Sequence, residues 1–99
     1  MAQFTVRVEL HGATAAHYET LNQRMEAANF KRLISGTDST GAKGWWRLPS
    51  GEYDYEADSK PELVRDLVKI LADSVKSGAW VLVTQVSARS WNTERIRNQ

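Results

Sequence analysis

Residues 4–10 constrain the fold more than any other stretch, because apolar and polar side chains alternate strictly along them. The apolar set is Phe4, Val6, Val8 and Leu10, and the polar set is Thr5, Arg7 and Glu9. A period of two is typical of a strand that has one face on a core and the other face near water. The sequence therefore predicts a half-buried first strand, and we expect the rest of the chain to cover its apolar face.

Apolar periodicity and turn residues predict two helices and three further strands. We expect a helix over residues 15–28, a strand over 30–35, a hairpin loop over 36–44, a strand over 45–56 with a turn or bulge at 49–51, a helix over 60–77 and a strand over 79–87. The order is strand, helix, strand, strand, helix, strand, which is the order of the ferredoxin-like fold.

Local signals mark the ends of the predicted helices. Thr14 is a suitable N-cap for the first helix, and Asn29 stands where a left-handed residue would end it. Ser59 and Glu62 have the spacing of a capping box at the start of the second helix, with Pro61 in its first turn.

The second helix carries two sets of apolar residues. We expect Leu63, Leu67, Ile70, Leu71 and Ser74 to form its inner face, with Val64, Val68 and Val75 on the flanks. The strand at 79–87 is apolar on both faces in its first half, so we expect cover on both. Two helices cannot easily supply that cover, and a homodimer could.

These elements predict an α+β fold, a ferredoxin-like βαββαβ sandwich. Four antiparallel strands would lie in the spatial order four, one, three, two, with both helices on one face. We expect residues 1–99 to form a single domain whose polar tail, 88–99, is flexible.

Composition excludes several classes of protein. The chain has no cysteine, so it has no disulfide, no thiolate zinc site and no cysteine nucleophile. His11 and His17 lack the spacing of metal ligands, and we expect no metal and no cofactor. A net charge of +1 argues against a protein that binds the backbone of duplex DNA. With no apparent signal peptide or membrane span, we expect a soluble, cytoplasmic protein without a membrane partner.

Histidine and tryptophan are the candidates for chemistry and for binding. His11 ends the first strand, where it is either a proton-transfer group or an ordinary turn residue before Gly12. Trp45 and Trp46 are neighbours in a strand and must point to opposite faces. One of the two therefore lies on the open sheet face or in an interface, where it stacks on bases or is buried by a partner.

Three stretches then resemble a known family of small proteins. They are residues 6–13, residues 48–53 and residues 81–85 together with Trp91. Over residues 4–91 the chain resembles the GhoS-type antitoxin family, which is similar to the ferredoxin-like nucleases of CRISPR adaptation. Those nucleases hold a metal with an acidic residue at the end of the first strand, whereas Glu9 and His11 occupy that region here.

The resemblance implies a metal-independent endoribonuclease, antitoxin-like, that cleaves single-stranded messenger RNA. Such a reaction needs a base, a proton donor and a cation beside the phosphate. The catalytic candidates are His11 for proton transfer, Tyr53 as a proton donor, and Arg7 or Arg47 for the phosphate charge. The RNA-binding candidates are Trp45, Trp46 and Arg89.

A second hypothesis remains from another class. The chain is then a non-catalytic homodimeric regulatory or protein-binding module, with aromatic strands buried between subunits. This hypothesis explains the strand with two apolar faces as well as the enzyme hypothesis does. The near-neutral charge favours this alternative. A small-ligand sensor is a third reading, and no polar pocket motif supports it.

Overall fold

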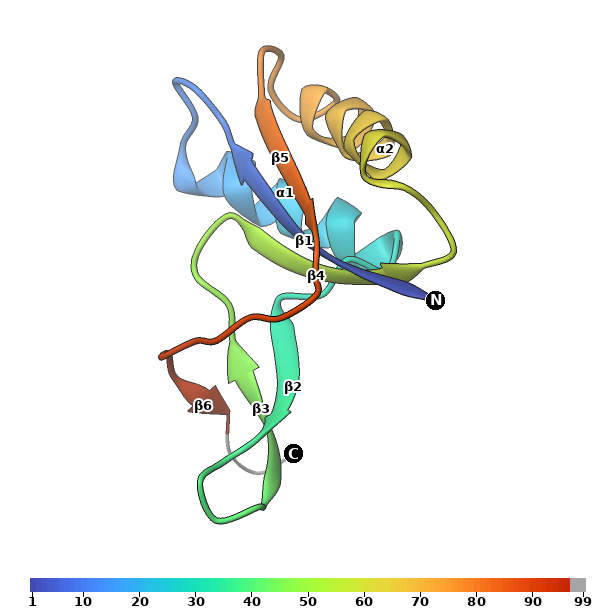
Figure 1. Ribbon diagram of the computed structural model, residues 1–99. Coiled ribbons are helices and arrows are strands. Elements are labelled where there is room, and N and C mark those ends of the chain that lie inside the picture. The colour runs from blue at the N-terminus through green and yellow to red at the C-terminus, as the bar shows by residue number, and fades with distance from the viewer. Residues whose placement is uncertain (97–99) are drawn as a thin grey trace.

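A computed structural model describes residues 1–96 of the chain. The fold is α+β, as the sequence predicts, with two helices and six strands in that range (Figure 1). In chain order the elements are β1 (Ala2–Glu9), α1 (Ala15–Ala27), β2 (Leu33–Thr37), β3 (Lys43–Arg47), β4 (Glu52–Ala57), α2 (Pro61–Asp73), β5 (Trp80–Gln85) and β6 (Arg95–Ile96).

The first sheet contains β4, β1 and β5, with β1 in the centre and both pairings antiparallel. The apolar residues of β1 and its end are buried, as their alternation predicts. They pack against one face of each helix, so both helices cover the same face of this sheet. The core consists of Phe4, Val6, Val8, Leu10, Leu21, Met25, Phe30, Tyr53, Val64, Val68, Ala72 and Ala79.

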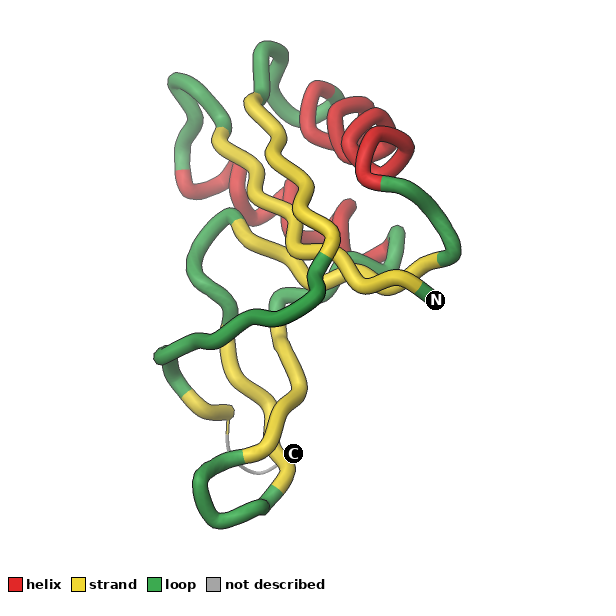
Figure 2. Tube along the Cα trace, viewed as in Figure 1, coloured by secondary structure: helices red, strands yellow, loops and turns green. Residues whose placement is uncertain are grey.

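The remaining strands form a second antiparallel sheet, in the order β2, β3, β6. Figure 2 shows it projecting from the layer that contains the helices. The chain thus builds two three-stranded sheets where the sequence suggested one sheet of four strands. The predicted order is kept for the last strand, the first strand and the second part of the third, β4. The first part of the predicted third strand, β3, pairs with the second strand in the other sheet.

The break between β3 and β4 explains this departure. Pro49 cannot donate to a ladder, and Gly51 has a φ of +81°. The hairpin therefore leaves the first sheet, and a single bridge joins it to β4. In that bridge Lys31 N–H donates to the Asp54 carbonyl at 2.8 Å, and Asp54 N–H donates to the Lys31 carbonyl at 2.7 Å.

The tail packs on the second sheet instead of continuing as a free end. The indole of Trp91 lies edge-on to that of Trp46, with ring centroids 5.9 Å apart. The Arg95 guanidinium lies 5.0 Å from the Trp46 ring and pairs with Asp38 at 2.6 Å. The flexible tail was expected over residues 88–99, of which residues 97–99 lie outside the described part of the chain.

The two helices begin differently. α1 has the predicted N-cap, since Thr14 Oγ1 accepts from the His17 N–H at 3.4 Å, and Asn29 has the left-handed φ of 71°. The capping box predicted at the start of α2 is wrong. The N-cap there is Lys60, which makes no side-chain cap hydrogen bond. Proline in the first turn limits the number of free amides that need a cap.

The inner face predicted for α2 is also largely wrong. The side chains that α2 buries are Val64, Val68 and Ala72, whereas Leu63, Leu67 and Ile70 are 58%, 39% and 70% exposed. Both sets are apolar and both have helical spacing, so periodicity alone does not choose between them. Neither helix within residues 1–96 is long and apolar enough to cross a membrane.

Candidate functional site

The face of the first sheet that the helices leave uncovered presents a mixed polar and aromatic surface. We call it the open face. From β1 it carries Arg7 and Glu9, which stand opposite Leu82 and Trp80 of β5. Trp80 is 68% exposed and Leu82 is 62% exposed. Ionisable groups and a large aromatic ring therefore lie side by side at one end of this face.

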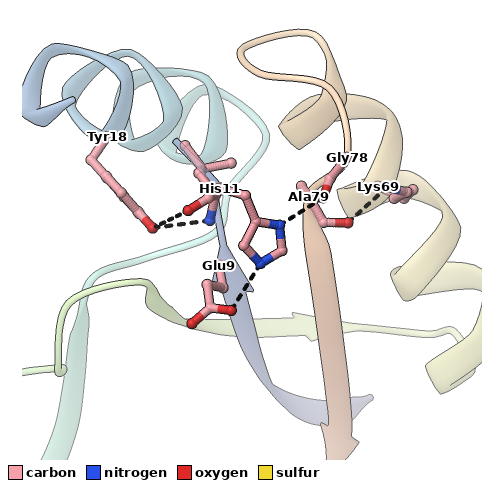
Figure 3. Close-up of polar contacts among 7 residues, drawn as sticks. Glu9, His11, Tyr18, Lys69, Gly78 and Ala79 are labelled. Carbon is pink, nitrogen blue, oxygen red and sulfur yellow. Dashed lines mark hydrogen bonds and ion pairs between the residues drawn. The ribbon is translucent and has the colours of Figure 1, made fainter. Parts of the chain in front are cut away.

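His11 joins this group at the end of β1 (Figure 3). Its Nε2 lies 3.0 Å from Glu9 Oε2, and its Nδ1 lies 3.0 Å from the carbonyl oxygen of Gly78. Both partners are acceptors, and each lies within reach of one ring nitrogen. The ring also stands edge-on to the Trp80 indole, with centroids 4.5 Å apart. The geometry thus holds the imidazole within hydrogen-bonding distance of a carboxylate and a backbone carbonyl.

A shallow hollow of about 310 Å³ lies beside this pair. It is lined by Arg7, Glu9, Trp80, Val81 and Leu82. The lining combines a cation, a carboxylate and an aromatic ring. A guanidinium binds phosphate, a carboxylate accepts a proton, and an indole stacks on a base.

Two residues of α2 hold the Gly78–Ala79 segment to which His11 is bonded. Lys69 Nζ donates to the Ala79 carbonyl at 2.7 Å, and the Ala79 N–H donates to Asp73 Oδ1 at 3.1 Å. Lys69 and Asp73 also pair at 3.0 Å. The hydrogen bonds from Lys69 and from the Ala79 N–H lower the pKa of Asp73. These contacts orient the carbonyl that receives the His11 hydrogen bond.

A tyrosine of α1 supports the residue that precedes His11. The Tyr18 hydroxyl accepts from the N–H of Leu10 at 2.9 Å and donates to the Leu10 carbonyl at 3.4 Å (Figure 3). It thereby ties the end of β1 to α1. His11 is thus positioned from both helices, although it is itself exposed.

Of the predicted catalytic residues, the structure brings Arg7 and His11 to the same end of the open face. Tyr53 lies elsewhere, because its side chain is fully buried on the helix-covered face of β4. Its hydroxyl donates to Asn22 Oδ1, and burial raises its pKa to about 12. Tyr53 is therefore a core residue in this structure, out of reach of the hollow.

The other predicted residues belong to the second sheet or to the tail. Arg47 pairs with Glu94 at 3.3 Å, and Trp45 is 38% exposed. Trp46 is covered by the tail residues described above. Arg89 donates to Thr5 Oγ1 and to Asp54 Oδ1, each at 2.9 Å, and fastens the tail to the first sheet.

The sequence predicts no functional role for Glu9, Trp80 or Gly78. The pair of Glu9 and His11 has a partial signal in the sequence. Residues two apart on a strand share a face, and His11 lies two positions after Glu9, the last residue of β1. Trp80 has none, because its place beside His11 depends on the register between β1 and β5.

No group of three or more side chains suited to hold a metal ion occurs in residues 1–96. The chain has no significant match to any protein-family model, curated protein or solved structure. Its function is therefore argued from the geometry of the open face.

Proposed function

We propose that the chain is an antitoxin-like endoribonuclease that cleaves single-stranded RNA without a metal ion. The observation that carries the proposal is the grouping of Arg7, Glu9, His11 and Trp80 at one end of the open face. These side chains supply a cation, a base, an acid and a stacking surface within one small area.

The reaction we propose is transfer within the RNA. The 2′-oxygen forms a bond to the adjacent phosphorus while the bond from phosphorus to the 5′-oxygen breaks. Glu9 takes the proton of the 2′-hydroxyl, and protonated His11 gives a proton to the leaving 5′-oxygen. Arg7 stabilises the charge on the phosphorane. The products are a 2′,3′-cyclic phosphate and a free 5′-hydroxyl.

The proposal includes the finer assignment of the fold. The arrangement of β4, β1 and β5 beneath two helices agrees with the core of a ferredoxin-like βαββαβ sandwich. In this view β2 is the fourth strand, displaced with its hairpin and attached through the bridge between Lys31 and Asp54. A messenger RNA substrate would also place the protein in the cytoplasm.

Incubation with labelled single-stranded RNA tests the proposal. We expect cleavage by the wild-type protein in the presence of a chelator, with cyclic phosphate ends on the products. An RNA with a 2′-deoxy residue at the cleavage site should resist. The His11→Ala protein should be inactive, and His17→Ala, which changes only the cap of α1, should keep its activity. Cleavage that persists in His11→Ala would refute the assignment.

A second candidate function is the non-catalytic homodimeric regulatory or protein-binding module. The exposed stripe of Leu63, Leu67 and Ile70 on α2 favours it, because clustered apolar side chains at helical spacing often mark an interface. A purified protein that shows no cleavage of RNA but loses self-association when Ile70 is changed to Lys would support this function over the first.

A further inference from the structure

The outer edge of β5 carries backbone groups with no strand beside them. Within residues 1–96, β5 pairs on one side only, with β1. Alternate residues of an antiparallel strand turn both their N–H and C=O groups to the same side. The Val86 N–H donates to Gln3 of β1 at 2.8 Å, so even-numbered residues face β1. The N–H and C=O groups of Val81, Val83 and Gln85 therefore point outward, and we call them the free edge.

The free edge has defined ends. At its start the outward groups of Ala79 are already bonded to Lys69 and Asp73 of α2. After Gln85 the chain leaves β5 and runs toward β4, the strand at the opposite edge of the sheet, where Arg89 contacts Asp54. The free edge thus contains three outward-facing residues.

The opposite edge of the same sheet differs. The outward N–H and C=O groups of Asp54 in β4 are both bonded to Lys31. A strand added at this point would have to break that bridge. Extension of the first sheet is therefore easier beside β5.

We infer that the free edge pairs with the free edge of a second copy of this chain, antiparallel, around a two-fold axis at Val83. The three outward residues are evenly spaced, so the rotation exchanges Val81 with Gln85 and places Val83 opposite itself. Each outward N–H then meets an outward C=O of the second copy. An axis at Leu82 would instead place Gln85 opposite Ala79, whose groups are already used.

Side chains on the open face agree with this pairing. Leu82 would stand opposite Thr84 of the partner subunit, and the exposed ring of Trp80 would stand opposite Val86 of the partner subunit. Cross-strand neighbours would thus cover apolar surface that is 62% and 68% exposed in the single chain. The result is a six-stranded sheet with both hollows on one face, roughly 20 Å apart along the strands.

The sequence suggests a homodimer because the last strand has two apolar faces. The inference specifies the interface of that homodimer, the free edge of β5, and the register of the paired strands. It rests on backbone geometry and does not depend on the cleavage of RNA. Its tests measure the mass in solution and cross-linking. The protein can therefore cleave RNA without forming this dimer, or form the dimer without cleaving RNA, and the experiments distinguish the two cases.

The first test is the mass in solution across a wide range of concentrations. The wild-type protein should reach twice the chain mass of 11.2 kDa. Gln85→Pro removes an outward N–H from the free edge, where proline is tolerated, and should remain a monomer. Glu56→Pro is the matched control and should still form the dimer. By alternation its N–H also points outward, but from β4 at the opposite edge of the sheet. A wild-type monomer at all concentrations, or a dimeric Gln85→Pro, would overturn the inference.

The second test reports the register and does not require a proline variant to fold. The chain has no cysteine, so introduced cysteines act alone. Leu82→Cys and Thr84→Cys, mixed and gently oxidised, should form a heterodimeric disulfide, since these positions face each other across the axis. Neither variant should cross-link by itself. Efficient cross-linking of Leu82→Cys alone would contradict an axis at Val83.

Discussion

The imidazole of His11 stands edge-on to the indole of Trp80, with ring centroids 4.5 Å apart and an interplanar angle of 77°. This contact joins the end of β1 to the start of β5, two segments almost seventy positions apart in the chain. It places a proton-transfer group beside an exposed stacking surface. The site thus depends on the pairing of two strands, and changes at either strand should affect it.

Glu9→Gln should remove cleavage while preserving the fold. The amide oxygen of glutamine can still accept the hydrogen bond from His11, but the side chain cannot accept the proton of a 2′-hydroxyl. We expect kcat to fall by about 10²- to 10⁴-fold, with little change in KM. Single-turnover cleavage of a labelled RNA measures this, and Glu56→Gln on β4 is the control. Unchanged kcat would exclude Glu9 as the base.

Trp80→Ala should weaken the binding of RNA. Stacking of a base on an aromatic ring contributes about 1–3 kcal/mol, so the Kd should rise roughly 5- to 150-fold. Fluorescence anisotropy at one fixed salt concentration measures the change. Trp45→Ala removes the exposed tryptophan of the second sheet, which was a candidate from sequence, and should leave the Kd nearly unchanged. The reverse ranking would move the binding surface to the second sheet.

Tyr53→Phe should keep cleavage and lose stability. The variant retains the buried ring but leaves Asn22 without its donor, at a cost of about 1 kcal/mol. Because burial raises the pKa of Tyr53 to about 12, above its ordinary value of 10.0, the protonated hydroxyl stabilises the folded state below pH 10. That contribution disappears as the pH rises from 10 to about 12. Urea unfolding of the wild-type protein and Tyr53→Phe between neutral and alkaline pH measures this change in unfolding free energy. If Tyr53→Phe instead lost cleavage of RNA, Tyr53 would have to act in the reaction.

Asp73→Asn should change the acid dependence of stability. Lys69 and the Ala79 N–H lower the pKa of Asp73 from its ordinary value of 3.8, so its charged form stabilises the folded state above that pH. The contribution is lost as the pH falls through the lowered pKa. The difference in unfolding free energy between wild type and Asp73→Asn should therefore shrink on acidification. A difference that stays constant down to acid pH would contradict this account.

Alternation along β1 is sufficient to predict which of its residues are buried, because a strand offers only two faces. The same rule puts Tyr53 and Tyr55 on one face of their strand, but it does not show which face of the sheet the helices cover. α2 has two apolar stripes, and only tertiary packing selects Val64 and Val68 over Leu67. Local patterns therefore predict the elements better than their orientation.

The candidate site is predictable only in part, for a related reason. Arg7 and Glu9 share one face of β1 because of the period of two, and His11 follows two residues beyond the end of that strand. Trp80 comes beside them through the register between β1 and β5, which no local pattern reveals. The second sheet is also beyond such patterns, since β6 is two residues long and owes its place to contacts of Trp91 and Arg95.

Gly51 gives a means of recognising related sequences. A side-chain carbon at this position would lie 2.7 Å from the carbonyl oxygen of Val8, and its φ of +81° disfavours any other residue. Its own carbonyl accepts from the Val8 N–H at 2.8 Å. Two features therefore form a sequence signature: a glycine directly before the strand that contains the buried Tyr53, and the alternation of apolar and polar residues along β1. We expect both to persist in distant relatives after most other positions have diverged.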